Sequence, residues 1–205
     1  MQSENYKFTI VNADTVDFDV RKQMSEIFSE GFSQWLVFFS KDKNKIAKAF
    51  AHMFVLNQFY VAIANNNKIA GMTACTDGAD RSVRLNKKEL RKHLGLFKGS
   101  MAGLFLKKEF EAPFEEFPPN TGSIEFVGTA SEFRGQGVAS QIIKHIIENT
   151  PYIDYVIEEV ADTNTSAMNL YNKLGFEEYK RKPLPEIRAK KIGINNFLSL
   201  KYVKK

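Results

Sequence analysis

The sequence is poor in the residues that build disulfides and metal centres. Cys75 is the only cysteine among 205 residues, which excludes an internal disulfide and a cysteine-based zinc cluster. The three histidines, His52, His93 and His145, are far apart and lack the spacing of metal ligands. We therefore expect no bound metal. Cys75 ends an apolar run that begins at Ile69, so we expect it to be a buried thiol.

Long hydrophobic runs and clustered basic charge are also missing. No run reaches the roughly 18 apolar residues that a membrane span needs, and the polar start Met1–Asn5 lacks the apolar segment of a signal peptide. We therefore expect no membrane partner and a cytoplasmic location. The net charge is +5, but the basic residues are spread along the chain, so a nucleic-acid partner is not indicated. This charge fits a solvated surface and only weakly favours an anionic ligand.

Periodicity predicts alternating strands and helices in one domain over residues 1–205. Its length, with 43% hydrophobic and 26% charged residues, is typical of a single globular domain. Apolar spacing predicts strands over Tyr6–Val11, Phe59–Ala64, Lys68–Thr76, Ser123–Ala130, Tyr152–Val160, Phe176–Lys180 and Asn196–Val203. It predicts helices over Val20–Leu36, Asp42–Leu56, Lys87–His93, Ser100–Phe110, Gly137–Glu148 and Ser166–Leu174. Three asparagines at 65–67 predict a β-hairpin, and the mixed order predicts an α/β architecture.

Residues 123–149 predict a phosphate-binding loop between a strand and a helix. Gly135 and Gly137 lack Cβ, so the backbone can turn sharply there and approach a ligand closely. The first helix amides have no intrahelical acceptors, and the helix dipole adds about half a positive charge at that end. With the cation of Arg134, these amides suit phosphate oxygens. The segment also fits a glycine-rich turn without a ligand.

Two other phosphate-binding motifs fit this segment less well. A P-loop ends in Gly-Lys-Ser/Thr, which is absent. A dinucleotide fingerprint, G-x-G-x-x-G, is matched only in part by Gly135, Gly137 and Ser140, although Glu158 lies about twenty residues on. Only 65 residues follow Ser140, few for the rest of a doubly wound fold and a substrate domain. A dinucleotide-dependent oxidoreductase is therefore the less favoured enzyme.

Two motifs, in order, resemble those of the GCN5-related N-acetyltransferase (GNAT) family. The run Arg134–Ala139 matches the family's acyl-CoA loop, Arg/Gln-x-x-Gly-x-Gly/Ala, and Asn164–Phe176 resembles its later helix, Asn-x-x-Ala-x-x-x-Tyr-x-x-x-Gly-Phe. The resemblance covers about Ser123–Tyr179, and the N-terminal half agrees only in the order of elements. It implies a mixed, mostly antiparallel sheet flanked by helices, whose splayed fourth and fifth strands hold acetyl-CoA. Gly128 is expected to permit the bulge that starts this splay.

The resemblance also implies which residues bind the cofactor. The backbone of Val127, Gly128 and Thr129 pairs with the pantetheine arm like an added strand. Asn164 contacts the cofactor as well. The pyrophosphate is held by the loop residues Arg134, Gly135, Gln136, Gly137, Val138 and Ala139.

The implied reaction moves an acetyl group directly to an amine acceptor, which is a small molecule or a peptide. Tyr171 matches the family tyrosine that protonates the leaving thiolate, so we expect it to be the general acid. Glu125 is the candidate general base, acting directly or through water. By alternation it shares a face with Ser123 and Val127, unless a bulge shifts the phase.

Several alternatives stay open at this point. Glu158 and Glu159 on the next strand compete with Glu125 for the role of base. A regulatory module that binds acyl-CoA without turnover is the non-enzymatic alternative. About 45 residues, 77–121, stand where the family has a short connection before its fourth strand. We expect a helical insertion that forms a lid or acceptor-binding element, or one that only packs on the core or mediates a homodimer.

Overall fold

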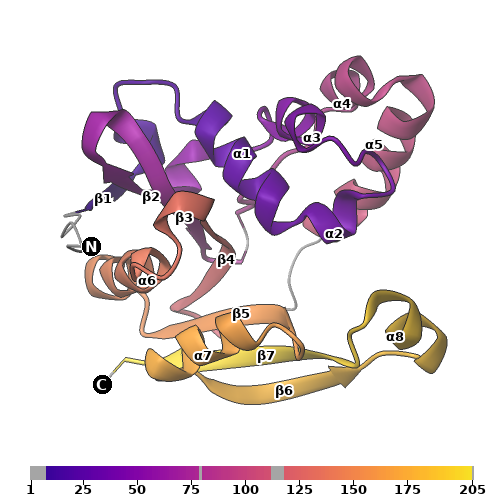
Figure 1. Ribbon diagram of the computed structural model, residues 1–205. Coiled ribbons are helices and arrows are strands. Elements are labelled where there is room, and N and C mark those ends of the chain that lie inside the picture. The colour runs from indigo at the N-terminus through magenta and orange to yellow at the C-terminus, as the bar shows by residue number, and fades with distance from the viewer. Residues whose placement is uncertain (1–7, 79, 112–117, 205) are drawn as a thin grey trace.

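The computed structural model describes residues 8–78, 80–111 and 118–204 (Figure 1). Within them a seven-stranded sheet has the order β1-β2-β3-β4-β5-β7-β6. Neighbouring strands are antiparallel, except that β4 and β5 are parallel. The strands are β1 (Thr9–Asn12), β2 (Phe59–Ala64), β3 (Lys68–Thr76), β4 (Thr121–Thr129), β5 (Asp154–Ala161), β6 (Glu177–Pro183) and β7 (Asn196–Val203).

Helices cover both faces of the sheet. The N-terminal group is α1 (Arg21–Gly31), α2 (Ser33–Leu36), α3 (Lys43–Phe50), α4 (Lys87–Leu94) and α5 (Leu96–Phe110). The C-terminal group is α6 (Val138–Asn149), α7 (Thr165–Lys173) and α8 (Glu186–Ile192). Figure 1 shows the first group beside β1 to β4 and above β5, β7 and β6, with α6 at the left and α7 in front of β5 and β7. None of the described helices is long and apolar enough to cross a membrane.

Each group of helices covers its own hydrophobic core. The core under the N-terminal helices centres on Phe28, which is fully buried. Five further rings have centroids 4.9 to 6.3 Å from the Phe28 ring: Phe32, Phe50, Phe54, Phe110 and Phe126. The second core, under α6 and α7, is built from aliphatic residues of α6 and from Tyr155 and Phe176. The chain has 18 phenylalanines. They serve mainly the first core, which ties α1, α3 and α5 to β4.

The predicted fold class is confirmed, and several bounds differ for local reasons. The strands β2, β3 and β7 have the predicted bounds, and Asn66 and Asn67 take positive φ in the hairpin. Tyr6 and Lys7 of the predicted first strand lie outside the described residues, as do residues 113–117 of the loop after α5. The helix predicted over Val20–Leu36 breaks at Phe32, which separates α1 from α2.

Two predicted helices differ from the structure at one end, and one helix was not predicted. The helix α3 ends at Phe50 because the chain after it pairs with residues 82–84, through Val55 N–H to Ser82 O and Arg84 N–H to Met53 O. Only Gly95 separates α4 from α5, so α5 begins four residues earlier than predicted. The helix α8 was not predicted, because its seven residues carry no regular apolar stripe. The structure agrees, since Ile187 is 87% exposed.

The strands β4 and β5 part after three paired residues. The pairs are Thr121 with Asp154, Gly122 with Tyr155 and Ser123 with Val156, and none follows within the described chain. Three residues beyond the last pair, each strand has a residue with left-handed backbone: Phe126 has φ 51° and Glu159 has φ 57°. Phe126 lies where the register between β4 and β3 shifts, and Glu159 lies where the register between β5 and β7 shifts. A non-glycine residue in such a conformation costs about 1–3 kcal/mol. The strands therefore part at two matched bulges, one on each strand.

The predicted role of Gly128 in starting the splay is wrong. The bulge lies at Phe126, and Gly128 is not among the residues with positive φ. A Cβ on Gly128 would lie 2.7 Å from Cγ2 of Ile27 on α1. Gly128 is therefore needed because α1 approaches the backbone of β4 closely.

We predict that Gly128→Ala lowers the free energy of unfolding by about 1–3 kcal/mol, because the added methyl group overpacks the contact with α1. The measurement is urea unfolding followed by circular dichroism. Gly31→Ala is the matched control, since a Cβ there would have no atom within 4 Å. Equal losses in the two variants would contradict the close approach of α1 and β4.

Candidate active site

Parting from β5 leaves one edge of β4 without a strand partner in the described chain. The other edge stays paired with β3, through Met72 with Gly128 and Gly71 with Thr129. The Ala130 N–H donates to Ala70 O at 2.9 Å, on the β3 side. Because backbone groups alternate in direction along a strand, those of Val127 and Thr129 face the free edge. An extended ligand can pair there as an added strand.

The loop after β4 leads directly into the N-terminus of α6. Gly135 and Gly137 have φ of 77° and 76°, in the left-handed region where glycine is favoured. No side chain caps α6, and its first backbone bond runs from Gln141 N–H to Gly137 O at 3.0 Å. Within the described residues, the amides of Val138, Ala139 and Ser140 therefore have no acceptor. A Cβ on Gly135 would meet no atom within 4 Å, so the loop faces open space.

Arg134 is the loop cation, and it is tied to α1. Its Nη2 lies 3.5 Å from Oε2 of Glu30. On the α1 side of the turn, Glu26, Glu30 and Glu132 help to line a hollow of about 90 Å³. These carboxylates disfavour a phosphate on that side, whereas the free amides of α6 favour one. Sequence reasoning missed Glu30, since nothing in the sequence links it to Arg134.

Glu125 lies on the face of β4 that α1 covers. It is paired with Ala74, a residue of the N-terminal core. The bulge turns Phe126 to this same face, while Val127 packs with the C-terminal core. Glu125 and Val127 therefore do not share a face, because the bulge shifts the alternation, which is the exception that the sequence prediction allowed. Glu125 and Ser123 do share a face, as predicted.

Two hydroxyl groups hold the Glu125 carboxylate. Thr76 Oγ1 donates to Oε1 at 3.0 Å, and Ser82 Oγ donates to Oε2. Burial raises the pKa of Glu125 above its ordinary value, and the hydrogen bonds from these hydroxyls partly offset the rise. Ser82 belongs to the insertion, so the insertion contacts the candidate base. No pattern in the sequence indicates either hydroxyl.

Tyr171 lies on the opposite face from Glu125. It is 5% exposed and belongs to the C-terminal core, together with Ile124 of β4 and Ile157 of β5. Its ring centroid is 6.1 Å from that of Phe176. Burial raises the pKa of Tyr171, so its hydroxyl stays protonated and can serve as a proton donor.

Three other predicted residues have partners in the structure. Asn164 caps α7, because its side-chain oxygen accepts from Ala167 N–H at 3.1 Å. The side-chain N–H groups of Asn164 stay available as donors. Glu158 accepts from Tyr179 OH and from Ser199 Oγ. Glu159 is exposed and lies 3.9 Å from Lys182, which makes it the weaker rival of Glu125.

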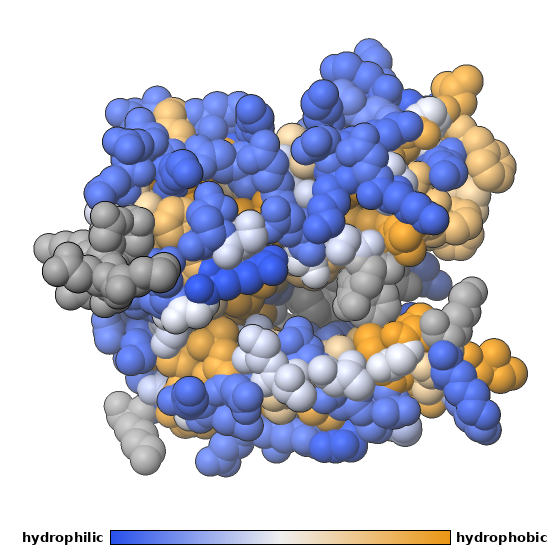
Figure 2. Space-filling model, viewed as in Figure 1, coloured by the Kyte–Doolittle hydropathy of each residue, from blue (hydrophilic) through white to orange (hydrophobic). Residues whose placement is uncertain are grey.

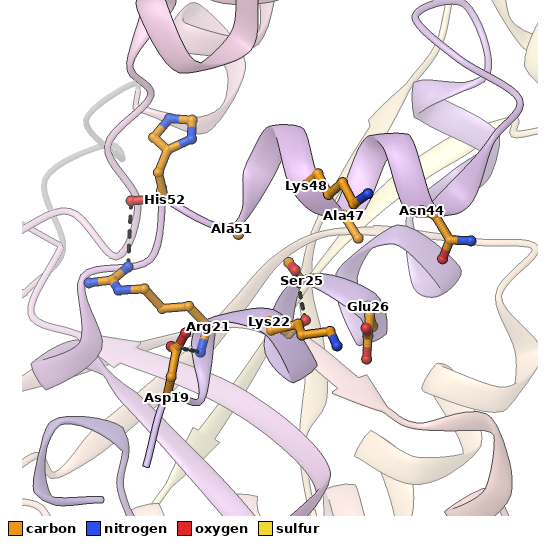
Figure 3. A pocket seen from close by; sticks show the side chains of 10 residues that line it. All are labelled: Asp19, Arg21, Lys22, Ser25, Glu26, Asn44, Ala47, Lys48, Ala51 and His52. Atoms are coloured by element: carbon orange, nitrogen blue, oxygen red, sulfur yellow. Dashed lines mark hydrogen bonds between the residues drawn. The ribbon is translucent and has the colours of Figure 1, made fainter. Parts of the chain in front are cut away.

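The surface is hollowed between the N-terminal helices and the β5-β7-β6 part of the sheet (Figure 2). A separate groove of about 480 Å³ lies between α1 and α3 (Figure 3). None of the predicted site residues lines that groove. One of its residues, Arg21, donates to Phe54 O at 2.7 Å and so braces the start of α1. The candidate site is therefore the gap between β4 and β5.

We predict a pH-dependent stability difference between the wild type and Glu125→Gln. Because the folded pKa of Glu125 is raised, the folded state binds more protons than the unfolded state above the ordinary value of 4.5. The wild type therefore loses stability relative to the variant as pH rises from 4.5 through the folded pKa. Urea midpoints measured across this range test it; a difference that is constant or has the opposite sign would contradict it.

Comparison with known proteins supports the family resemblance. The model of the acetyltransferase (GNAT) family matches residues 21–176. An N-acetyltransferase from Staphylococcus aureus Mu50 has a TM-score of 0.61 at 17% identity, over 95% of this chain and 100% of that chain. A GCN5-related N-acetyltransferase from Kribbella flavida gives 0.56 at 13% identity, over 96% and 97%. The NatC complex bound to Gag peptide and CoA gives 0.54 at 14% identity, over 97% and 99%.

A comparison with curated protein sequences finds no match. At identities this low, the solved structures show the fold alone. The family model shows more than the fold, because it matches the sequence itself over residues 21–176, from the start of α1 to the end of the Asn164–Phe176 motif. The chain therefore belongs to the acetyltransferase (GNAT) family, whose members are acyltransferases.

Proposed function

We propose that this protein is an N-acetyltransferase that moves an acetyl group directly from acetyl-CoA to an amine. One observation carries the proposal: β4 parts from β5 directly before a helix N-terminus with free amides. The free strand edge suits the amide-bearing pantetheine arm, and the amides suit the diphosphate. CoA is bound in one structure with this fold, the NatC complex. The cytoplasmic location and the homodimer stay predictions from the sequence.

The proposed cofactor site has three parts. Val127, Gly128 and Thr129 supply the strand edge. The loop from Arg134 to Ala139 supplies amides and a cation for the diphosphate. Asn164 supplies side-chain N–H groups from the cap of α7.

The acceptor amine must be neutral to attack a thioester. An alkylammonium group with pKa about 10.4 is neutral in roughly one of 2,500 molecules at pH 7. We assign the removal of its proton to Glu125, whose raised pKa brings it nearer to working pH, where a general base is most effective. A backbone N–H of Val127 or Thr129 at the free edge would then stabilise the oxyanion.

The two faces of the sheet separate the two proton transfers. Glu125 lies on the α1 face and Tyr171 on the face of the C-terminal core. In this proposal the amine enters from the Glu125 side and the sulfur leaves on the Tyr171 side. Acetyl-CoA supplies the activated acyl group, and Tyr171 donates a proton to the thiolate as the carbon–sulfur bond breaks. The acetyl group crosses between the parted strands without a covalent enzyme intermediate.

The two alternatives make different claims about ligands and turnover. A dinucleotide-dependent oxidoreductase would bind NAD in preference to acetyl-CoA. A regulatory module would bind acetyl-CoA but would release no CoA thiol with any amine. The presence of Tyr171 favours turnover, because a binding module has no need of a proton donor there.

We predict that Tyr171→Phe binds acetyl-CoA with unchanged affinity but loses about a hundredfold or more in kcat, because it lacks the proton donor. Calorimetry measures the affinity, with NAD as the contrasting ligand, and thiol release with a panel of amines measures turnover. Tyr202→Phe is the matched control, since it removes a hydroxyl from a residue packed against the same core. Full turnover in Tyr171→Phe would remove Tyr171 from the mechanism.

We also predict that Glu30→Gln tightens acetyl-CoA binding about twofold to tenfold, because Glu30 competes with the diphosphate for Arg134. Glu26→Gln carries the same charge change one turn earlier on α1 and has no ion pair with Arg134 among the described residues. It should therefore have a smaller effect. Calorimetry at low salt measures both; equal effects, or weaker binding in Glu30→Gln, would show that Arg134 does not reach the diphosphate.

A further inference from the structure

The helix α5 of the insertion presents an apolar stripe to solvent. Phe97, Leu104 and Phe105 are 75%, 70% and 55% exposed. Together with the partly buried Met101 they follow the spacing i, i+4, i+7 and i+8, so the four share one face of the helix. Figure 2 shows hydrophobic side chains gathered at the upper right, where Figure 1 places α5. A surface helix normally turns such a face to the core.

The other sides of α5 explain why this stripe points outward. A Cβ on Gly99 would lie 2.5 Å from Cα of Arg91, so α5 passes α4 at close range through a side that carries glycine. Ala102 and Leu106 fill the side that is buried in the N-terminal core. The large apolar side chains of the stripe are therefore left to the solvent, where they are free to meet a partner.

The helix pair α4 and α5 also carries the positive charge of the protein. Residues 87–110 hold seven Lys or Arg residues against two glutamates, a net charge of +5, so the rest of the chain has no net charge. By helical spacing Lys98 and Lys107 flank the apolar stripe, and Lys108 lies one turn beyond Leu104 on the same face. Lys107 is 4.0 Å from Glu111, whereas Lys98 and Lys108 have no ion pair within the part of the chain that the structure describes.

Charge and shape decide what can cover this face. A second copy of the chain would bring the same positive charge, and like charges oppose each other across an interface. The stripe protrudes, whereas a partner protein that binds a helix face needs a matching groove. A bilayer with anionic lipids offers both negative charge and an apolar interior that protruding side chains can enter.

We propose that α5 docks on an anionic lipid bilayer, with Phe97, Leu104 and Phe105 inserted between the headgroups and the flanking lysines bound to them. This docking does not depend on the proposed acetyl transfer. The expectation of no membrane partner rested on the missing spanning run, and a helix that lies in the interface needs no such run. The proposal replaces that expectation.

The first test is flotation of the full chain with vesicles of phosphatidylcholine, either alone or with about 30% phosphatidylserine. We expect the anionic vesicles to bind about tenfold or more tighter than the neutral ones at low salt, and added salt to weaken this binding by screening. No binding to anionic vesicles, or equal binding to both kinds, would overturn the proposal.

The second test concerns the apolar stripe. Leu104→Gln should weaken binding to anionic vesicles about tenfold, because it removes an apolar side chain from the bilayer. The matched control is Ile187→Gln, which removes an apolar side chain that is 87% exposed on α8 and should bind like the wild type. Circular dichroism checks that both variants are folded. Unchanged binding in Leu104→Gln would show attraction by charge alone and would overturn the insertion of the stripe.

The third test concerns the lysines. Lys108→Gln should weaken binding to anionic vesicles about fivefold, since one basic residue near a charged surface contributes about 1 kcal/mol. Lys144→Gln makes the same charge change at an exposed position of α6 and should have a much smaller effect. Equal losses in the two variants would mean that only the net charge matters, which would overturn the assignment to α5.

The other possible occupants of the stripe are tested without lipid. Light scattering measures whether Leu104→Gln changes the oligomeric state, and poly-L-glutamate is the probe for an acidic protein. We expect neither the oligomeric state nor any binding of poly-L-glutamate to change in this variant. A dimer that Leu104→Gln dissociates, or poly-L-glutamate binding that it weakens, would show that the stripe binds protein and would overturn the proposal.

Discussion

The parting of β4 from β5 is the constraint on which the rest of the structure depends. It arises where Phe126 and Glu159 take left-handed backbone at the same level of two parallel strands. Neither residue is glycine, so the surroundings must offset a cost of about 1–3 kcal/mol at each bulge. Phe126 does so by packing its ring against Phe28, Phe32 and Phe110. The first hydrophobic core therefore stabilises the opening of the sheet.

The insertion is joined to the same region by buried polar groups. Glu111, at the end of α5, is 7% exposed; it accepts from Leu85 N–H at 2.7 Å and from Arg81 at 3.0 Å. Ser82 lies between these two partners and donates to Glu125. Residues 81–85 thus connect the two helices of the insertion to the candidate base. Of the roles expected for the insertion, this contact favours one close to the acceptor over one in packing alone.

Sequence patterns predicted what depends on local chemistry and missed what depends on distant contacts. The glycine loop at 135–137 and the hairpin at 65–67 follow from backbone preferences of single residues, so both were found. The bulge at Phe126 was assigned to Gly128 because phenylalanine has no intrinsic preference for positive φ; only its packing in three dimensions holds it there. Thr76, Ser82 and Glu30 were missed for a similar reason, since each meets its partner across a long stretch of chain.

The residues assigned to the base and to the acid lie on opposite faces of the opened sheet, so the position of the cofactor decides the account. A crystal structure with bound CoA is the most direct measurement. We expect the pantetheine arm along β4, hydrogen-bonded to Val127 and Thr129, and the diphosphate against the amides of residues 138–140. A cofactor bound elsewhere, for example in the groove between α1 and α3, would contradict the account.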